Sequence, residues 1–440
     1  MKRPIQRSAV DPRSHQRAAS GKRGFRSLSR RARRRITLAV AGIIALAVLG
    51  TGAIAVGAFV DLSNGLHRST FTLPNGIEVK QDSSATNILV MGLDSRLDEN
   101  GKALPQSVYD ALHAGTQNDG GYNANVLMVI HLPGDGGKAS GISIPRDDYV
   151  TLAGHPDGVS KGKIKQAYGL TLDQKLRELK RAGNLSGAEA YQQARAAGRQ
   201  AEISTVSTFL GGLAINHFVE ITMAAFYQTA LAVQPITVCV NENTQDAYSG
   251  AVFHAGTQAL TAAQAVSFVR QRRDTSDSGL NFSDLDRERR QQAFIVSLAY
   301  KMKQANTFEN LGTLQSLIGA AKQNIAVDTG FDPLSFAAQG SKIAGGNISF
   351  STLPIEGFGT VGGQSVNLVD LNHVRSAVNQ LIGPVVTPSS QPGTTVSGGA
   401  PSSQPSPSKS PAASASSTPD QNVYNDWSSP LKSGSIPCVK

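Results

Sequence analysis

The stretch 126–146, VLMVIHLPGDGGKASGISIPR, contains two apolar runs separated by a segment with Gly and Pro. Short runs of apolar and β-branched residues that are bounded by turn residues are typical of β-strands. A third such run, NILVMGL, occupies residues 87–93. Because these runs are apolar almost throughout, both faces of the sheet that they form should be covered. We therefore predict an α/β fold, a layered sandwich in one domain over residues 85–384.

Further elements are predicted along the same segment. Strands are expected at 218–222, 236–240 and 348–353. Helices are expected at 172–181, 187–210, 261–272, 283–304 and 368–381. The helices expected at 261–272 and 283–304 begin with cap signals, since Gln264 follows Thr261 by three residues and Asp286 follows Ser283 by three.

The positive charge of the chain is concentrated near its N-terminus. Of the 42 Lys and Arg residues, thirteen lie in residues 1–35, and the rest of the chain is nearly neutral. Residues 36–60, ITLAVAGIIALAVLGTGAIAVGAFV, carry no charge. As a helix they would reach about 37 Å, more than the ~30 Å of a hydrocarbon core. We predict a transmembrane anchor at 36–60 with the basic tail in the cytoplasm, because Lys and Arg beside a span stay inside.

This topology predicts a cell-membrane protein with a stalk at 61–84 and an extracytoplasmic domain at 85–384. Residues 385–440 are Pro- and Ser-rich over most of their length and are predicted to form a disordered tail. A cleaved signal peptide is the alternative for the anchor, although the apolar run is longer than in most signals. We expect the basic tail to set the topology and to contact anionic lipid, and we do not expect nucleic acid as a partner.

The two cysteines, Cys239 and Cys438, both fall in the part predicted to be exported. A disulfide is chemically permitted there, and we predict a single bridge that ties the C-terminus to the domain. The alternative is two unpaired thiols. One pair is too few for a disulfide scaffold or a cysteine metal site.

Polar residues gather where the predicted strands end. Asp94 follows the first strand, Asn125 precedes the second, and Arg146 follows the third. If the three strands form an antiparallel meander, these positions share one edge of the sheet. Any one of them could simply punctuate a loop, but three at one edge indicate a site.

An arginine-rich stretch, RQRRDTSDSGLNFSDLDRERRQQAF, occupies residues 270–294. Arg270 and Arg272 end one predicted helix, while the next helix turns one face inward near its N-terminus, where anions are favoured. That inward face carries Arg287, Arg290 and Gln291, whereas Glu288 and Arg289 are predicted to lie on the surface. Planar arginine forks suit phosphate or pyrophosphate. The alternative is an internal ion-pair network with Asp274, Asp284 or Asp286.

Several familiar catalytic signals do not occur in the sequence. It contains neither a P-loop nor a GxGxxG motif before a helix, and the metalloprotease HExxH motif is also missing. A metal here would be a hard cation held by oxygen atoms and phosphate, hence Mg²⁺.

Six blocks of the sequence, in order, resemble the LytR-CpsA-Psr family of membrane-anchored enzymes of Gram-positive cell walls. They are NILVMGLDSR, VLMVIHL leading to SIPRDDYV, KIKQAYG, INHFVEITMAAF, AVSFVRQRRD and DLDRERRQQAF, and they cover roughly residues 86–298. The resemblance implies an α-β-α sandwich with a mixed central sheet and a lipid groove. It also implies a Mg²⁺-dependent phosphotransferase that moves a glycopolymer from a polyprenyl-pyrophosphate carrier to peptidoglycan.

The resemblance also implies roles for individual residues. The pyrophosphate would be bound by Arg146, Arg270, Arg272, Arg287, Arg290 and Gln291. The metal would be held by Asp94, and we expect the Asn125 amide oxygen to be a second ligand. Apart from the resemblance, we expect the catalytic residues to be Asp94, Arg146, Asp147 and Arg272, because the acceptor hydroxyl needs a proton acceptor and Asp94 or Asp147 can serve.

The sequence departs from the family before the second strand, where Asn123-Ala124-Asn125 replaces the usual Arg-Ser-Asp. An asparagine oxygen is a weaker, neutral ligand for Mg²⁺. Asp119, or Asp98 and Glu99, could compensate for the missing carboxylate. The alternatives are a scaffold that binds lipid pyrophosphate or glycan without turnover, and a transcriptional regulator that acts through the basic tail.

Overall fold

The computed structural model describes residues 61–74, 85–183, 185, 187–276, 280–304, 311–333, 347–383 and 423–440. The predicted cytoplasmic tail, the predicted anchor at 36–60 and residues 384–422 lie outside the described residues. Within the described ranges, no helix is both long and apolar enough to cross a membrane.

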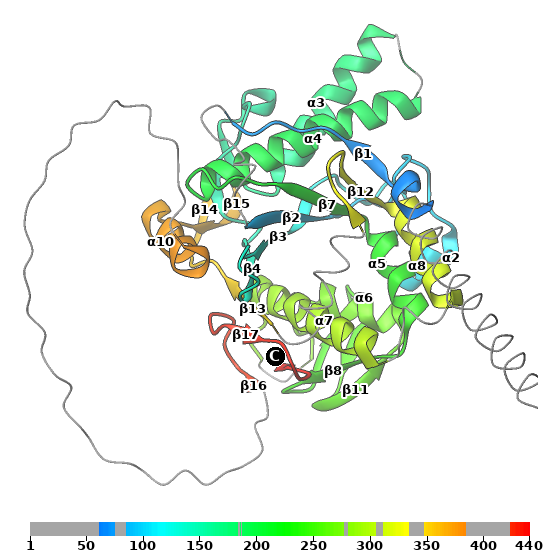
Figure 1. The fold of residues 1–440 in the computed structure, drawn as a ribbon, viewed down its shortest axis with the longest axis vertical. Coiled ribbons are helices and arrows are strands. Elements are labelled where there is room, and N and C mark those ends of the chain that lie inside the picture. The colour runs from blue at the N-terminus through cyan, green and yellow to red at the C-terminus, as the bar shows by residue number, and fades with distance from the viewer. Residues whose placement is uncertain are drawn as a thin grey trace, which may run out of the picture. The chain divides into compact units, whose positions relative to one another are not determined.

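A mixed eight-stranded sheet forms the centre of the domain, in the order β1-β12-β7-β2-β3-β4-β13-β17 (Figure 1). Its middle is the predicted meander: β2 (Thr86–Leu93) pairs antiparallel with β3 (Ala124–Leu132), and β3 pairs antiparallel with β4 (Ala139–Ser143). Parallel neighbours flank it, since β7 (His217–Ile221) pairs with β2 and β13 (Ile348–Thr352) pairs with β4. The prediction of an α/β fold with a mixed central sheet is confirmed.

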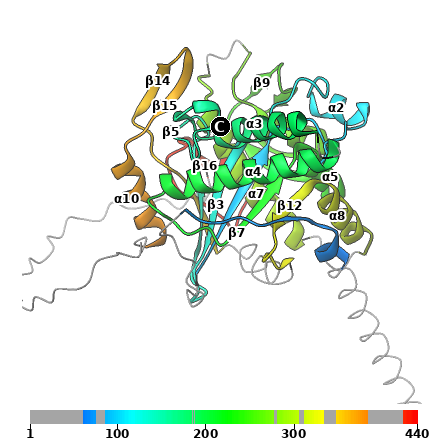
Figure 2. The same ribbon diagram turned by 90° about the horizontal axis from the view of Figure 1, so that it is seen from above.

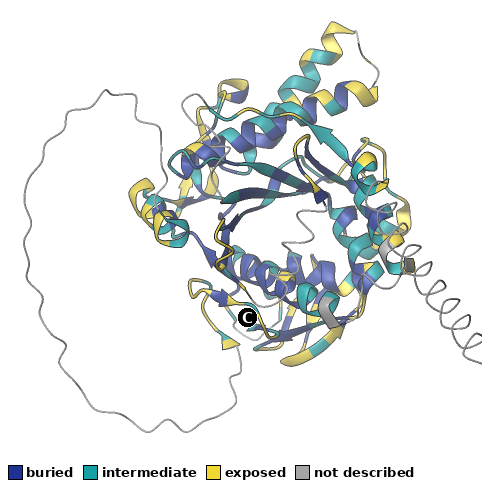
Figure 3. Cartoon of the chain, in the orientation of Figure 1, coloured by how far each residue is buried: buried dark blue, intermediate teal, exposed yellow. Residues whose placement is uncertain are grey.

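Helices cover both faces of this sheet. Successive side chains along a strand point to opposite faces, and apolar side chains on each face pack into a separate core. From β2, Leu89 and Met91 join a core with α3 (Gln166–Ala182), α4 (Gly187–Phe209) and α10 (Leu371–Ile382). Ile88, from the same strand, joins the opposite core with α5 (Met223–Val233), α6 (Ala262–Arg270) and α7 (Asp284–Gln304). Figure 2 shows α3 and α4 running side by side, and Figure 3 shows that the central strands are buried.

Buried charges attach α4 to the sheet. Arg199 pairs with Glu220 of β7 at 2.8 Å and with Glu99 at 2.6 Å, and Arg195 pairs with Glu99 at 2.7 Å. All four side chains are at most 2% exposed. Removing one member of such a network leaves an uncompensated buried charge, so the network makes the position of α4 specific.

Smaller sheets surround the central one. A four-stranded sheet has the order β11-β8-β18-β16, and the hairpins are β5-β6, β9-β10 and β14-β15. The elements not yet bounded are β1 (His67–Ser69), β5 (Tyr149–Thr151), η1 (Pro156–Gly158), β6 (Lys161–Lys163), β8 (Ile236–Val240), β9 (Thr244–Asp246), β10 (Ala251–Phe253), β11 (Gly256–Leu260), α2 (Gln106–Leu112), α8 (Leu311–Asn324), β12 (Ile325–Asp328), β14 (Gly357–Val361), β15 (Gln364–Leu368), β16 (Val423–Tyr424), β17 (Leu431–Lys432) and β18 (Cys438–Val439).

Two predicted boundaries are wrong. Residues 67–69, assigned to the stalk at 61–84, form β1 and pair with β12 at the edge of the central sheet. The folded domain therefore begins before residue 85. The tail predicted to be disordered over 385–440 ends in a folded segment, 423–440, whose β17 and β18 add to both sheets. This segment differs from the Pro/Ser-rich part because Leu431 and Val439 bury completely.

The C-terminal segment 423–440 is also tied covalently. A disulfide joins Cys239 of β8 to Cys438 of β18, across 199 residues of sequence. The same segment receives hydrogen bonds from α7: Arg290 Nε donates to the Lys440 carbonyl at 2.7 Å, and Arg289 Nη2 donates to the carbonyls of Asp426, Trp427 and Ser429. The segment therefore contacts α7 at Arg289 and Arg290.

Candidate active site

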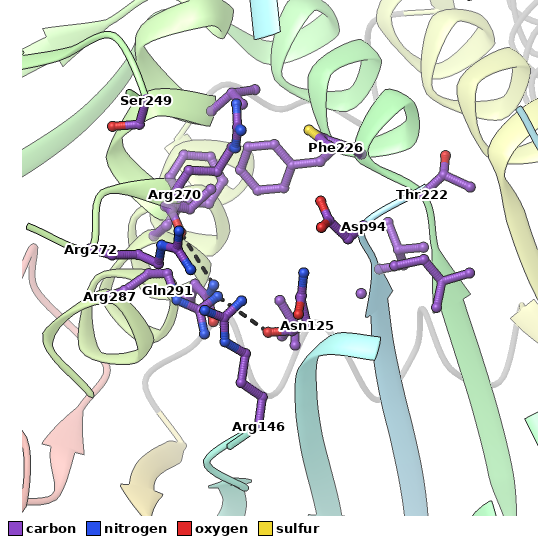
Figure 4. Close-up of a pocket in the computed structure, with 18 of the residues that line it drawn as sticks. Asp94, Asn125, Arg146, Thr222, Phe226, Ser249, Arg270, Arg272, Arg287 and Gln291 are labelled. Carbon is purple, nitrogen blue, oxygen red and sulfur yellow. Dashed lines mark hydrogen bonds between the residues drawn. The ribbon is translucent and has the colours of Figure 1, made fainter. Parts of the chain in front are cut away.

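A cavity of about 340 Å³ lies where the predicted meander edge meets α5, α6 and α7 (Figure 4). Asp94, Asn125 and Arg146 all line it, as expected from the antiparallel pairing of β2, β3 and β4. Arg270, Arg272, Arg287 and Gln291 line it as well. The polar residues at the strand ends and the arginine-rich stretch 270–294 therefore line the same cavity.

The rest of the cavity wall is largely apolar. Aliphatic and aromatic side chains come from the sheet and from three helices: Val90, Leu93, Val126, Ile221, Met223, Phe226, Val266, Val269, Phe294 and Ile295. Phe226 and Phe294 stack on each other with ring centroids 4.8 Å apart. The cavity thus joins an apolar wall to a cationic one, which suits a ligand with an apolar chain and an anionic head.

Asp94 and Asn125 supply oxygen atoms from the edge of the sheet, and Asn125 lies beside Arg287, whose Nη1 donates to the Asn125 carbonyl at 3.2 Å (Figure 4). Asp94 is bound by Arg96, whose Nη1 also donates to the Asp94 carbonyl at 2.8 Å. The Oδ1 atom of Asn125 is buried without a hydrogen-bond partner among the described residues. Such an unpaired buried oxygen is costly unless a ligand satisfies it.

These two residues fit a hard cation. Mg²⁺ is commonly held by one or two carboxylates, with phosphate oxygens completing its shell. The described residues contain no cluster of three His, Cys, Asp or Glu side chains that could hold a metal by themselves. A cation here would therefore depend on Asp94, on the Asn125 amide and on oxygen atoms of the ligand.

Arg146 and Arg287 both donate hydrogen bonds to the carboxylate of Asp284. Arg146 donates from Nε and Nη2 at 3.0 and 2.8 Å, and Arg287 donates from the same two nitrogens at 2.9 Å each. Burial of Asp284 opposes its ionisation, but the charges of Arg287 and Arg146 outweigh that effect and hold its pKa well below its usual range. The internal ion-pair network predicted as the alternative to phosphate binding is therefore present for these two arginines.

Local caps position both arginine-bearing helices. Thr261 and Gln264 form the predicted capping box of α6, and Ser283 and Asp286 exchange hydrogen bonds at the start of α7. After α6 the chain becomes extended around the buried Gln271, so that Arg270 and Arg272 both reach the cavity.

The two arginines after α6 differ in their surroundings. Arg270 donates to the carbonyl of Leu112, and burial followed by the charge of Arg96 lowers its pKa. Arg272 is exposed and makes no hydrogen bond or ion pair with the part of the chain that the structure describes. Its guanidinium is thus available to a ligand.

Gln291 lies beside these arginines on α7. Its Nε2 donates to the Val269 carbonyl at 3.2 Å, which links α7 to the end of α6. The side chain lines the cavity, as the helical periodicity predicted.

Arg290 does not line the cavity, so its position does not support its predicted role in binding pyrophosphate. It is fully buried, and it donates to Gln271 Oε1 and Thr244 Oγ1 at 2.6 and 3.0 Å. Burial lowers its pKa to about 9. Helical periodicity placed Arg290 on the inward face of α7. Part of that face lines the cavity, and the part that carries Arg290 packs in the interior against the C-terminal segment.

Two further predictions about α7 are wrong, because Glu288 and Arg289 are buried rather than on the surface. The C-terminal segment covers Arg289, and no sequence signal placed that segment there. Burial, followed by the charge of Asp284, raises the pKa of Glu288 to about 8.

Asp147 is not part of the cavity wall, so its predicted catalytic role is not supported by its position. It pairs with Lys165 at 2.7 Å and with Lys163 at 3.2 Å. Burial of Asp147 opposes its ionisation, but Lys165 and Arg146 together lower its pKa. The carboxylate serves to anchor β6 beside the end of β4.

Other cavity residues were not predicted from the sequence. Asp246, Tyr248 and Ser249 belong to the β9-β10 hairpin, and Arg273 follows Arg272. The segment DAYSG reads as an ordinary turn. Only the packing of this hairpin against α2 and α6 brings it to the cavity.

Comparisons with known proteins agree with the sequence blocks. A sequence model of the LytR_cpsA_psr family matches residues 62–382. The cell wall biosynthesis protein LcpA of Corynebacterium glutamicum is 34% identical over 354 residues, which cover 79% of this chain and 65% of that relative. This chain therefore spans less than two thirds of the length of that relative. The polyisoprenyl-teichoic acid–peptidoglycan teichoic acid transferase TagT of Bacillus subtilis is 23% identical over 302 residues, which cover 66% of this chain and 76% of TagT.

Solved structures also match. The LytR-Csp2A-Psr enzyme from Actinomyces oris matches with 18% identity and a TM-score of 0.46, over 72% of this chain and 96% of that one.

Proposed function

This chain belongs to the LytR-CpsA-Psr family, and from that membership we propose that it is a phosphotransferase acting in cell-wall assembly. The proposed reaction moves a glycopolymer from a polyprenyl-pyrophosphate carrier to a hydroxyl of peptidoglycan. A phosphodiester forms at the acceptor hydroxyl, the bond between the two phosphates breaks, and polyprenyl phosphate leaves. The observation that carries the proposal is the cavity itself, in which an apolar wall meets exposed Arg272 and the unpaired Asn125 oxygen.

The apolar wall suits the prenyl chain. Each methylene that leaves water for such a wall contributes about 0.8 kcal/mol. Phe226 and Phe294 form an aromatic surface within reach of the arginines. A lipid bound there would leave its pyrophosphate at the cationic side.

The cationic wall would hold the pyrophosphate and stabilise the charge that develops during transfer. Arg272 offers a guanidinium that has no hydrogen-bond or ion-pair partner among the described residues, and Arg270 lies two residues before it. Arg146 and Arg287 share the single carboxylate of Asp284, so the trio keeps a net positive charge. The guanidinium groups of Arg146 and Arg287 already donate to Asp284. Arg272 would therefore bind the pyrophosphate directly, and Arg146 and Arg287 would contribute positive charge near it.

We propose that Asp94 and Asn125 hold Mg²⁺ together with the phosphate oxygens. When bound, the ion would neutralise phosphate charge and orient the leaving group. The carboxylates in the cavity wall are Asp94 and Asp246, and either can accept the proton of the acceptor hydroxyl.

We also propose that the chain is a single-pass protein of the cell membrane. In this arrangement residues 1–35 lie in the cytoplasm, residues 36–60 anchor the chain, and the folded domain is outside. The Cys239–Cys438 disulfide supports this location, since such bonds persist in oxidising compartments. A reporter fused after residue 60 should be exported, and a cytoplasmic signal would contradict the topology.

The activity is tested with the full-length chain in detergent, Mg²⁺ and a glycan linked to polyprenyl pyrophosphate. We expect release of polyprenyl phosphate, and we expect Arg272→Ala to abolish it. Arg181→Ala is the matched control, because Arg181 is exposed on α3 and does not line the cavity. Equal activity of Arg272→Ala and the wild type would exclude this cavity as the active site.

Asn125 favours a second candidate function, a scaffold that binds the lipid pyrophosphate without turnover. An amide oxygen carries no charge, so it binds Mg²⁺ more weakly than a carboxylate. Binding of the substrate without product, together with turnover in Asn125→Asp, would select the scaffold. Turnover by the wild type would exclude it.

A further inference from the structure

We propose that Tyr248 and Arg273 form a sugar-binding subsite at the mouth of the cavity. This subsite would hold the first sugar of the glycan, the one joined directly to the pyrophosphate. The inference rests on the proposed function, because it assumes that a glycan-linked pyrophosphate enters this cavity. It adds a determinant of specificity that lies outside the phosphate-binding residues.

Tyr248 presents an aromatic ring to solvent at the cavity. The residue lines the cavity and yet is 69% exposed, which places it at the mouth. The Arg273 guanidinium covers one face of the ring, at 4.1 Å from its centroid. This contact holds the ring in one orientation and leaves its other face open. An aromatic face fixed in this way can stack on the C–H face of a pyranose ring.

The loop that carries Tyr248 is held in place before any ligand binds. The Tyr248 amide donates to Asp246 Oδ1 at 3.0 Å, and the Ala247 amide donates to Thr275 Oγ1 at 3.3 Å. Gly250 has a φ of 70°, and a Cβ at this position would come within 2.5 Å of the His113 ring. The loop therefore packs directly on the C-terminal end of α2. A preformed subsite loses less conformational entropy on binding.

The position of this loop matches the chemistry of the proposed substrate. The first sugar is one glycosidic oxygen away from the pyrophosphate, so it must lie next to the arginines that bind the phosphates. Arg273 is adjacent in sequence to Arg272, and both line the cavity. The prenyl chain would take the apolar wall on the other side, which leaves the Tyr248 side of the mouth for the sugar.

Binding of two probes to the full-length chain in detergent tests the subsite. One probe is farnesyl pyrophosphate, and the other is farnesyl pyrophosphate that carries one N-acetylglucosamine. Tyr248→Ala should weaken binding of the sugar-bearing probe by roughly three- to tenfold, the range expected for one aromatic contact. The affinity for the sugar-free probe should not change. Tyr248→Phe should retain most of the affinity because the ring remains.

Phe358→Ala is the matched control, since Phe358 is 70% exposed on the β14-β15 hairpin and does not line the cavity. This control should bind both probes as the wild type does. Equal weakening of both probes by Tyr248→Ala, or no weakening of either, would overturn the subsite while leaving the proposed function intact. If the wild type binds neither probe, the proposed function fails and the subsite fails with it.

Discussion

Replacement of Asp284 by alanine should destabilise the protein by about 3 kcal/mol. Asp284 accepts four hydrogen bonds, two from Arg146 and two from Arg287, at 2.8–3.0 Å. The two arginine side chains are 6% and 5% exposed, so the substitution would leave two buried guanidiniums without their shared counter-charge. Breaking a buried pair costs about 3–5 kcal/mol. The carboxylate itself is 26% exposed, and this solvent screening favours the lower end of that range.

Thermal unfolding of the full-length chain measures this effect. For a domain of this size, 1 kcal/mol corresponds to about 2 °C, so the Tm should fall by roughly 6 °C. Inorganic pyrophosphate should restore part of the loss, because it can take the place of the carboxylate between the two arginine forks. Asp173→Ala is the control: Asp173 also pairs with an arginine, Arg177, but its side chain is 53% exposed. Such a pair contributes about 0–1 kcal/mol.

The pH dependence of the same variant follows from the sign of the shift. The pKa of folded Asp284 is lowered, so its contribution is complete above the unfolded pKa of about 4 and is lost as the pH falls toward the folded value. The difference in Tm between the wild type and Asp284→Ala should therefore shrink below pH 4. A variant that melts within 1 °C of the wild type at pH 7 would refute the shared ion pair.

The other predictions concern the disulfide, a buried carboxyl and the loop beside the cavity. Cys239→Ser should lower the free energy of unfolding by about 3–5 kcal/mol, measured in urea, because the bridge closes a loop of 199 residues. Glu288 has its pKa raised to about 8, so the folded state keeps a proton that the unfolded chain releases above pH 4.5. The contribution of Glu288 to the free energy of unfolding should therefore decrease by about 3 kcal/mol between pH 5 and pH 8. Glu288→Gln, measured by urea unfolding, should not show this decrease. Gly250→Ala should cost roughly 2 kcal/mol in urea unfolding because it adds the clash with His113 to an unfavourable φ, whereas Gly154→Ala, with a similar φ and open space, should cost about 1.

Much of the site was predictable because short-range rules position it. The apolar runs of β2, β3 and β4 implied a buried meander, and antiparallel pairing then placed Asp94, Asn125 and Arg146 at one edge. The caps at Thr261 and Ser283 mark the starts of α6 and α7, and helical periodicity from Ser283 placed Arg287 and Gln291 on a face that lines the cavity. These features depend on neighbours within a few residues or on adjacent strands, so the sequence displays them.

The errors occurred where a distant segment decides the environment of a side chain. Arg290 and Arg289 were misplaced because the C-terminal segment 423–440 returns to cover α7, more than a hundred residues later in the chain. Asp147 was misplaced because β6 brings Lys163 and Lys165 against it. Tyr248 and Ser249 reach the cavity only through the packing of their hairpin against α2 and α6.

The sequence by itself therefore determined the central strands, the two capped helices and the set of charges available to one edge of the sheet. Periodicity and capping are local properties of the backbone, and they are readable from residue order. Only the tertiary structure decided which arginines meet a ligand and which are held inside. Asp284 engages Arg146 and Arg287, the C-terminal carbonyls engage Arg290, and Arg272 stays open. Such choices depend on which partner, of many with the same charge, the long-range packing brings within hydrogen-bond distance.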